Sequence, residues 1–269
     1  MAPVEAEDRF VALMGGPEAG LPLDEAMFLI AQQADPTVDV ECQLRALDDL
    51  AAECPAPTLD ALVRHLFVDL GFTGNRDDYY DPRNSYLDQV LERRVGIPIS
   101  LAVLAIVVGR RLGVPLAGVG MPGHFLLRDR VLPDVFIDPF RGAVIDPAGC
   151  AQVFRALHGA SASFDERFLE PVTSRTILRR VLANLAAVHR TSGDRTALVG
   201  VLRLRAAIPG VTVEERRELA EALAAVGQFS AAAEVLEAVA AGEGGDRAAV
   251  DLTAATRYRV ASRWSVVRS

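Results

Sequence analysis

The chain has 269 residues, of which 51% are hydrophobic and 24% are charged, and its formal net charge is -8. This length and composition are enough to bury the core of one large domain or of two smaller ones. The acidic balance argues against sequence-independent binding to nucleic acid, which needs clustered basic side chains opposite the phosphates.

The cysteines and the N-terminal sequence indicate the expected compartment. Cys42, Cys54 and Cys150 are widely spaced and form no CxxC pattern, so neither a zinc site nor a disulfide framework is expected. The opening sequence, MAPVEAEDRF, lacks the basic and then apolar pattern of a signal peptide. The longest apolar run, residues 97–108, is shorter than a membrane-spanning helix. We therefore expect a cytoplasmic protein without a membrane, nucleic-acid or cofactor partner.

The first 70 residues predict three packed amphipathic helices. Apolar side chains recur at helical spacing from Leu23, again over residues 40–54, and again from Thr58 to Leu70. Thr58 suits the N-cap position of the third helix. Residues 71–83 are polar and contain two glycines and a proline, so a surface loop is expected there.

A short helix and then a buried helix are expected next. Asn84 or Ser85 can cap the first of them, and Gly96 ends it. Pro98 suits the first turn of the next helix, because the amide hydrogen that proline lacks would be unpaired there. Residues 99–112 are apolar nearly all round, so this helix should lie at the centre of the domain.

Beyond the buried helix the sequence predicts short strands. The apolar runs at 125–127 and 135–137 are separated by a polar stretch that is consistent with an antiparallel hairpin. A turn centred near Val131 places His124 opposite Asp138, and facing side chains on paired strands lie about 5 Å apart at Cβ. We therefore expect a direct contact between His124 and Asp138.

From about residue 161 the pattern is again helical. Short turns separate four alanine-rich segments and predict helical hairpins over residues 177–190, 195–208, 213–226 and 230–241. The fragment LAEALAAVGQFSAAAEVLEAVA has the small-residue and aromatic placement of a tetratricopeptide-type unit, with at most two weak repeats. Glycines at 241–246 predict a flexible break, and the tail after them has no assigned structure.

Four motifs occur in an order and spacing that resemble the SirB-like family of transglutaminase-like proteins with a C-terminal tetratricopeptide region: NSYL at 84–87, GIPISL at 96–101, PGHF at 122–125 and DPFRG at 138–142. The resemblance implies an α+β fold, in which a helical N-terminal part packs with a small antiparallel sheet in a transglutaminase- and papain-like core. It implies a transglutaminase-like domain over residues 1–160 and a helical tetratricopeptide-like region over residues 161–269.

The resemblance also implies a partial catalytic triad. In the wider transglutaminase-like superfamily, a nucleophilic cysteine begins the central helix, and a histidine and an aspartate follow on successive strands. His124 and Asp138 match the last two positions, but Pro98 stands where the cysteine belongs. Ser100 is the hydroxyl in the same helical turn, yet two residues along a helix rotate a side chain by about 200°. An alcohol is also a poorer nucleophile than a thiol.

Each candidate residue also has an ordinary structural explanation. His124 and Asp138 can form a buried pair that only stabilises the fold, and Asn84 and Tyr86 can be a helix cap and a half-buried aromatic side chain. Gly123 would let a ligand or a backbone segment approach closely. The residues expected to line a pocket are Asn84, Tyr86, Pro98 and Gly123. No metal site is predicted, because the other histidines lack partners at ligand spacing: His65, His158 and His189.

Three functional hypotheses follow. The leading one is a non-catalytic adaptor or regulator that binds a protein partner through its C-terminal helices. The alternative is a hydrolase or acyltransferase that uses Ser100, His124 and Asp138; it requires the Ser100 hydroxyl within about 3 Å of a His124 nitrogen. The alternative fails if Ser100 points into the core. In a third hypothesis the helical repeats are the whole function and the front domain is only a cap.

Overall fold

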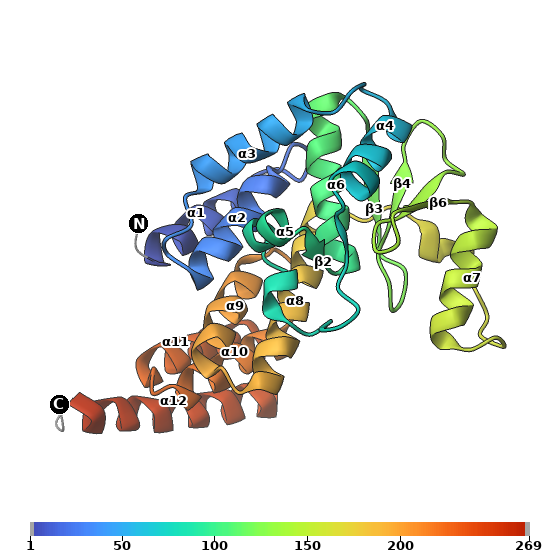
Figure 1. Cartoon of the computed structure of the whole chain (residues 1–269). Coiled ribbons are helices and arrows are strands. Elements are labelled where there is room, and N and C mark those ends of the chain that lie inside the picture. The colour runs from blue at the N-terminus through green and yellow to red at the C-terminus, as the bar shows by residue number, and fades with distance from the viewer. Residues whose placement is uncertain (1–2, 267–269) are drawn as a thin grey trace.

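The computed structural model of the protein describes residues 3–266, with side chains described for residues 5–263. This part of the chain is mostly helical and contains one four-stranded and one two-stranded sheet, so its class is α+β. Figure 1 shows the helices of residues 3–52 on one side of the central helix α6 (Pro98–Leu112) and the four-stranded sheet on the other. The C-terminal helices extend away from both.

The N-terminal part confirms the three predicted helices and adds one before them. Thr58 caps the last of them as predicted, because its Oγ1 accepts a hydrogen bond from the Ala61 amide at 3.3 Å. The additional helix buries Phe10 and Met14, which lie one turn apart on its inner face. The elements are α1 (Pro3–Gly15), α2 (Leu23–Ala34), α3 (Val40–Ala52), α4 (Leu59–Arg64) and the π-helical turn η1 (His65–Asp69) that continues α4.

The segment before α6 differs from its prediction. The expected loop contains the short strand β1 (Thr73–Gly74) and the 3₁₀ turn η2 (Pro82–Asn84), and β1 pairs in parallel with β2 (Val95–Gly96). The following helix α5 covers only Leu87–Arg93. Neither Asn84 nor Ser85 caps it, since Tyr86 occupies the N-cap position and the Asn84 side chain bonds to the preceding loop instead.

Helix α6 is the buried centre of the fold, as its apolar sequence predicts. Every residue from Pro98 to Gly109 is buried, and Pro98 lies in the first turn. Gly113 ends the helix in the left-handed conformation, with φ of 73°. The N-terminal end of α6 is therefore held in place by packing and can form one wall of an adjacent site.

The four-stranded sheet is antiparallel throughout, in the order β3-β4-β5-β6. Leu127 pairs with Ile137, so the hairpin is centred at Leu132, one residue beyond the predicted Val131. One face packs on the main core around α6, and the other packs on α7 through a separate apolar cluster. The elements are β3 (Leu116–Val119), β4 (Leu126–Asp129), β5 (Phe136–Asp138), β6 (Ala143–Ile145) and α7 (Pro147–His158).

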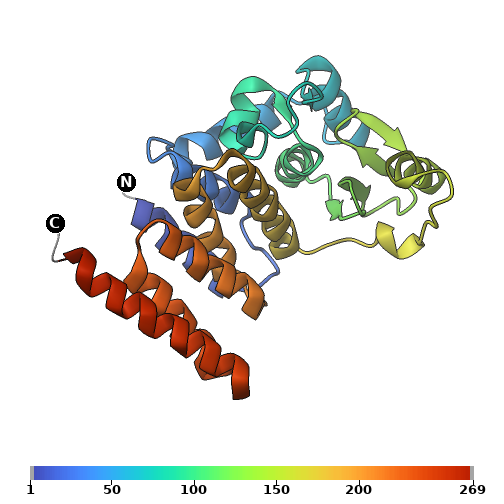
Figure 2. The ribbon, with the colours of Figure 1, turned by 90° about the horizontal axis from the view of Figure 1, so that it is seen from below.

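The C-terminal part confirms the four predicted helices and contains a fifth. Residues 243–244 alone separate the last two helices, so the expected flexible break is only a short connection. Figure 2 shows the last helix along the outer edge of the molecule, at the opposite end from the sheet. The elements are η3 (Glu166–Leu169), α8 (Ser174–Ser192), α9 (Arg195–Ala207), α10 (Val213–Ala225), α11 (Phe229–Gly242) and α12 (Gly245–Val266).

One apolar core connects the front of the molecule to the C-terminal helices. It includes Phe10 on α1, the buried face of α6, Leu182 on α8 and Leu223 on α10. The predicted division at residue 160 stays a prediction, and so does the tetratricopeptide character of the later helices. Within residues 3–266, no helix combines the length and the apolar character needed to cross a bilayer.

Candidate functional site

A hydrogen-bonded histidine and aspartate lie where the sheet meets the start of α6. The His124 Nε2 atom is 3.0 Å from Asp138 Oδ1, so the predicted contact is confirmed. The two side chains are 10% and 1% exposed. Asp138 ends β5, and His124 stands just before β4.

The turn before His124 explains how its side chain is placed. The His124 amide donates to the Met121 carbonyl at 3.1 Å, across a Pro122-Gly123 pair that is typical of a type II turn. Gly123 has φ of 72°, a left-handed value that side-chain-bearing residues rarely adopt. A Cβ atom at Gly123 would also lie 3.0 Å from His158 Nε2. Glycine is therefore required for this turn.

Asp138 fixes the orientation of the imidazole. Its Oδ1 also accepts a hydrogen bond from the Phe140 amide at 3.1 Å, and its Oδ2 lies 3.7 Å from Arg141 Nε. A carboxylate only accepts hydrogen bonds, so the contact places a hydrogen on His124 Nε2. The other ring nitrogen, Nδ1, has no hydrogen bond to any residue whose side chain is described, and it remains available to a ligand.

The His124 side chain lines a cleft of about 240 Å³. Pro98 and Gly123 line it, as the sequence predicts, but Arg180 and Asn184 from α8 were not anticipated. Those two residues are one helical turn apart and so share a face. The complete lining is Tyr79, Pro98, Ile99, Gly123, His124, Phe125, Arg180 and Asn184.

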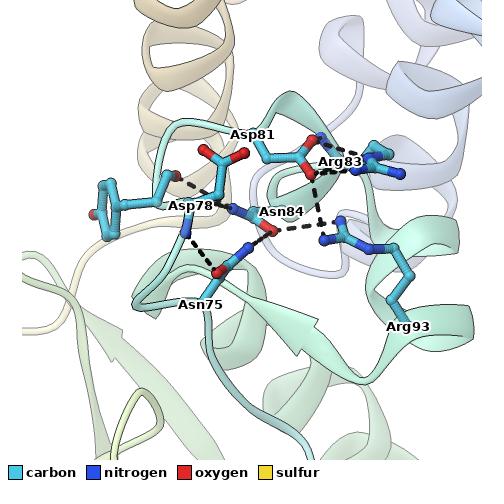
Figure 3. Close-up of polar contacts among 7 residues, drawn as sticks. Asn75, Asp78, Asp81, Arg83, Asn84 and Arg93 are labelled. Carbon is cyan, nitrogen blue, oxygen red and sulfur yellow. Dashed lines mark hydrogen bonds and ion pairs between the residues drawn. The ribbon is translucent and has the colours of Figure 1, made fainter.

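Asn84 does not line the cleft but holds one of its walls. It is 0% exposed, and its Nδ2 donates to the carbonyls of Asp78 at 2.7 Å and Tyr79 at 3.2 Å. Its Oδ1 accepts from Asn75 Nδ2 at 3.1 Å. Figure 3 shows Asn84 at the centre of this network, enclosed by the loop. The expectation that Asn84 is a pocket residue is wrong, because its amide is fully used in fixing the loop that carries Tyr79.

Charged side chains extend the Asn84 network. Asp81 accepts hydrogen bonds from the Arg83 guanidinium, which hold the pKa of that carboxyl below its usual value. Arg93 on α5 lies 3.3 Å from the same carboxylate and donates to Asn84 Oδ1 at 3.4 Å. In Figure 3, Arg83 and Arg93 approach Asp81 and Asn84 from one side. The loop is thus tied to α5.

Ser100 has a structural role and cannot act as the nucleophile. It is 0% exposed, and its hydroxyl donates to the Asn84 carbonyl at 2.6 Å and accepts from the Ile97 amide at 3.1 Å. A Cβ atom at Gly96 would lie 2.7 Å from this oxygen. The predicted Ser100, His124 and Asp138 triad is therefore wrong, because the hydroxyl caps α6 inside the core and does not reach the cleft.

Tyr86 belongs to a different cavity. Its hydroxyl lies 3.1 Å from His189 Nε2 on α8, and both residues are buried. They line a space of about 470 Å³ that also contacts Gln33 and Asp194. Burial raises the pKa of Tyr86 and lowers that of His189. Tyr86 therefore lines this separate cavity and not the His124 cleft, in which it was expected together with Pro98 and Gly123.

The three cysteines lie away from the cleft. Cys42 lies on α3 and is exposed, and Cys54 lies just beyond the end of α3 and is partly exposed. Cys150 lies on α7 and is buried. Burial raises the pKa of Cys150 to about 12, so its thiol is protonated at neutral pH. Among the described side chains that line the cleft, the one hydroxyl is the phenol of Tyr79, and burial raises its pKa. Within the same described residues, no group of three or more potential metal ligands is found.

The family described as the transglutaminase-like superfamily matches residues 30–183, more than half of the chain. The chain belongs to the transglutaminase-like superfamily. The matched range runs from α2 into α8, and it includes both His124 and Arg180. In this superfamily the nucleophilic cysteine begins the central helix. Pro98 lies in the first turn of α6 and lines the cleft together with His124.

Proteins from bacteria and animals are similar in sequence to parts of the chain. A UPF0162 protein of Xylella fastidiosa is 42% identical over 193 residues, which cover 66% of this chain and 69% of that protein. A UPF0162 protein of Pseudomonas aeruginosa is 33% identical over 186 residues, 65% of this chain and 67% of that protein. F-box only protein 21 of Homo sapiens is 36% identical over 156 residues, 52% of this chain and 23% of that protein. No solved structure matches.

The superfamily match leaves two finer predictions untested. The relatives named above carry no SirB-like name, so that narrower resemblance stays a prediction. The match ends at residue 183, within α8, so it does not bear on the tetratricopeptide character of α9 to α12.

Proposed function

We propose that this transglutaminase-like protein is non-catalytic: it binds a ligand in the His124 cleft without turnover and acts as a cytoplasmic adaptor or regulator through a protein partner. The observation that carries the proposal is Pro98. A proline lies beside His124 where the superfamily has its cysteine, and it offers neither a thiol nor a hydroxyl. The buried hydroxyl of Ser100 cannot replace it.

The remaining cleft supports binding rather than chemistry. A covalent mechanism needs a nucleophile within hydrogen-bond reach of its base. Asp138 orients the His124 imidazole, and Nδ1, which has no hydrogen bond to any described side chain, can hold a ligand. The unpaired thiols of Cys42, Cys54 and Cys150 support the cytoplasmic setting.

Helix α8 gives the cleft a physical connection to the helices behind it. It contributes Arg180 and Asn184 to the cleft, and it packs against α9, which in turn packs on α10. The partner surface is assigned to α10–α12, where a groove of about 440 Å³ contains both charged and apolar side chains. Helix α8 thus joins the cleft to the helices that carry the proposed partner surface.

The decisive experiment is a turnover assay on the full chain. Amide, ester and glutamine-donor substrates are incubated with the protein, and product is measured by mass spectrometry over a day. We expect product formation at the rate of a buffer blank, and the same result for His124→Ala. Turnover that disappears in His124→Ala would contradict the proposal.

The adaptor role needs a separate test with a matched pair of positions. A photo-crosslinking amino acid is placed either at Val250 on α12 or at Val131 in the β4–β5 turn, two valines that are 68% and 69% exposed. We expect crosslinks to one defined protein from position 250 and none from position 131. Equal crosslinking from both positions would contradict the assignment of the partner surface to the C-terminal helices.

A further inference from the structure

Arg180 is held at the wall of the cleft by backbone and aromatic contacts. Its Nη2 donates to the His124 carbonyl at 3.2 Å and approaches the Met121 carbonyl at 3.5 Å. The guanidinium carbon lies 5.1 Å from the centre of the Phe125 ring, a cation–π distance. The guanidinium is therefore oriented before any ligand arrives.

Among the residues whose side chains are described, Arg180 has no carboxylate counter-ion. No carboxylate oxygen of a described side chain lies within 4.0 Å of the Arg180 guanidinium, the distance limit for an ion pair. Other arginines of α8 do form ion pairs. Arg175 lies 3.4 Å from Glu18, and Arg179 lies 2.5 Å from Glu215. Burial lowers the pKa of Arg180, because the guanidinium has lost part of its hydration. An anion from solution would compensate this charge.

The groups around Arg180 favour a carboxylate. The sequence contains no lysine, and Arg180 is the one arginine in the described lining of the cleft. A single guanidinium offers a planar pair of donors that matches the two oxygens of a monoanionic carboxylate. Asn184, one turn further along α8, is exposed and has no hydrogen-bond partner among the described residues. It can bind a polar group beside the carboxylate.

The dimensions of the cleft limit the ligand. Its volume of about 240 Å³ is below the roughly 300–1,000 Å³ of sites that enclose drug-sized molecules. Pro98, Ile99 and Phe125 provide apolar walls beside the polar groups. The space therefore suits a small apolar group that ends in a carboxylate.

We propose that the His124 cleft binds a carboxylate-terminated ligand, in which Arg180 pairs with the carboxylate while His124 and Asn184 hydrogen bond to polar groups beside it. A free small carboxylate and the C-terminal residue of a peptide share this chemistry. The inference rests on the proposed function, since it takes the cleft as a site that holds its ligand without turnover.

Isothermal titration calorimetry on the full chain tests the ligand class. The probes are N-acetyl-leucine, its amide, a hexapeptide that ends in leucine with a free carboxylate, the same peptide with an amidated end, and inorganic phosphate. We expect the free carboxylates to bind at least about tenfold more tightly than the amides, the effect of losing one charge-assisted hydrogen bond. Tighter binding of the peptide than of N-acetyl-leucine identifies a peptide C-terminus, and equal binding identifies a small carboxylate.

Variants on α8 locate the site. Arg180→Gln is expected to weaken carboxylate binding at least about tenfold, whereas the adjacent Arg179→Gln leaves it within about twofold, because Arg179 faces Glu215. Asn184→Asp provides a second test that leaves Arg180 in place. It puts a carboxylate one turn from the guanidinium at an exposed position, so it should weaken binding by a similar factor without loss of folding.

Three results would overturn the inference: no binding of any free carboxylate to the folded wild-type protein, tighter binding of phosphate than of every carboxylate, or carboxylate binding that survives both Arg180→Gln and Asn184→Asp. These outcomes are distinct from failure of the proposed function. Missing carboxylate binding leaves the turnover assay negative, whereas turnover that depends on His124 defeats the non-catalytic assignment even if carboxylates bind.

Discussion

Within the described part of the chain, two histidines form a hydrogen bond to another side chain, and their partners differ. His124 bonds to the carboxylate of Asp138 at 3.0 Å, beside the cleft at the start of α6. His189 bonds to the phenol of Tyr86 at 3.1 Å, between α8 and the segment before α5. Each pair includes a residue of one of the four sequence motifs, but the two pairs line separate cavities.

The difference shows what each pair can do. The charged carboxylate of Asp138 only accepts hydrogen bonds, so it fixes which nitrogen of His124 carries hydrogen and leaves Nδ1 for a ligand. A buried phenol offers no such charge, and burial lowers the pKa of His189. The first pair is therefore suited to binding, and the second joins α8 to the front of the molecule.

Asn84→Ala should have the largest effect, because it removes the support of the cleft while leaving the Tyr86 and His189 side chains in place. The loss of hydrogen bonds to Asp78, Tyr79 and Asn75 is expected to lower the free energy of unfolding by about 2–4 kcal/mol. Urea denaturation measures this. Asn184→Ala is the matched control, since Asn184 is exposed, and should stay within about 0.5 kcal/mol. Equal losses for both variants would contradict the supporting role of Asn84.

Ser100→Ala is expected to have a somewhat smaller effect, about 1–3 kcal/mol less stable in the same urea titration. The substitution leaves the Ile97 amide and the Asn84 carbonyl without their partner inside the core. The exposed Ser161→Ala should change the free energy of unfolding by less than about 0.5 kcal/mol. An unchanged stability in Ser100→Ala would restore Ser100 as a candidate for a role other than capping.

The buried His189 of the Tyr86 and His189 pair should make the free energy of unfolding depend on pH in the acid range. Burial lowers the pKa of His189 in the folded state, so the unfolded chain binds more protons once the pH falls below the ordinary value of about 6.5. The free energy of unfolding should therefore decrease below that pH, and His189→Gln should reduce the slope.

Tyr86→Phe is the control for the acid dependence. It removes the phenol but keeps the buried imidazole, so the slope should stay close to that of the wild type. Thermal unfolding followed by circular dichroism between pH 7.5 and 5, a range of about one unit or more either side of the ordinary histidine pKa, measures both variants. The same slope in His189→Gln and wild type would show that other groups cause the acid dependence.

The contact between His124 and Asp138 was predictable from sequence because it depends on a local hairpin. The spacing of the two apolar runs is enough to bring the side chains together, even though the turn is centred one residue later than expected. Asn84 was expected to cap a helix or to line the pocket, and it does neither. Its amide bonds to carbonyls of the preceding loop, and the positions of those carbonyls depend on the folded path.

Arg180 and Asn184 could not be predicted as cleft residues. The helix that carries them was expected, but Arg180 is 56 residues from His124 in sequence, and only the packing of α8 on α6 brings them together. Tyr79 was missed for a related reason, because a polar loop gives no sequence signal for the direction in which its side chains point. Local patterns therefore predicted most of the helices, the β4–β5 hairpin and one contact, while the tertiary packing completed the cleft.

In the proposed function, the cleft keeps a histidine and aspartate pair like that of its superfamily, and Pro98 replaces the nucleophile. Pro98→Cys tests this claim most directly, in a background of Cys42→Ser and Cys54→Ser that leaves only the buried Cys150. At pH 6 we expect iodoacetamide to alkylate the introduced thiol several-fold faster than Cys42 of the wild-type protein, because the helix start and His124 favour the thiolate. Addition of His124→Ala should abolish the advantage. An introduced thiol that reacts no faster than Cys42, or whose rate is unchanged by His124→Ala, would contradict the account.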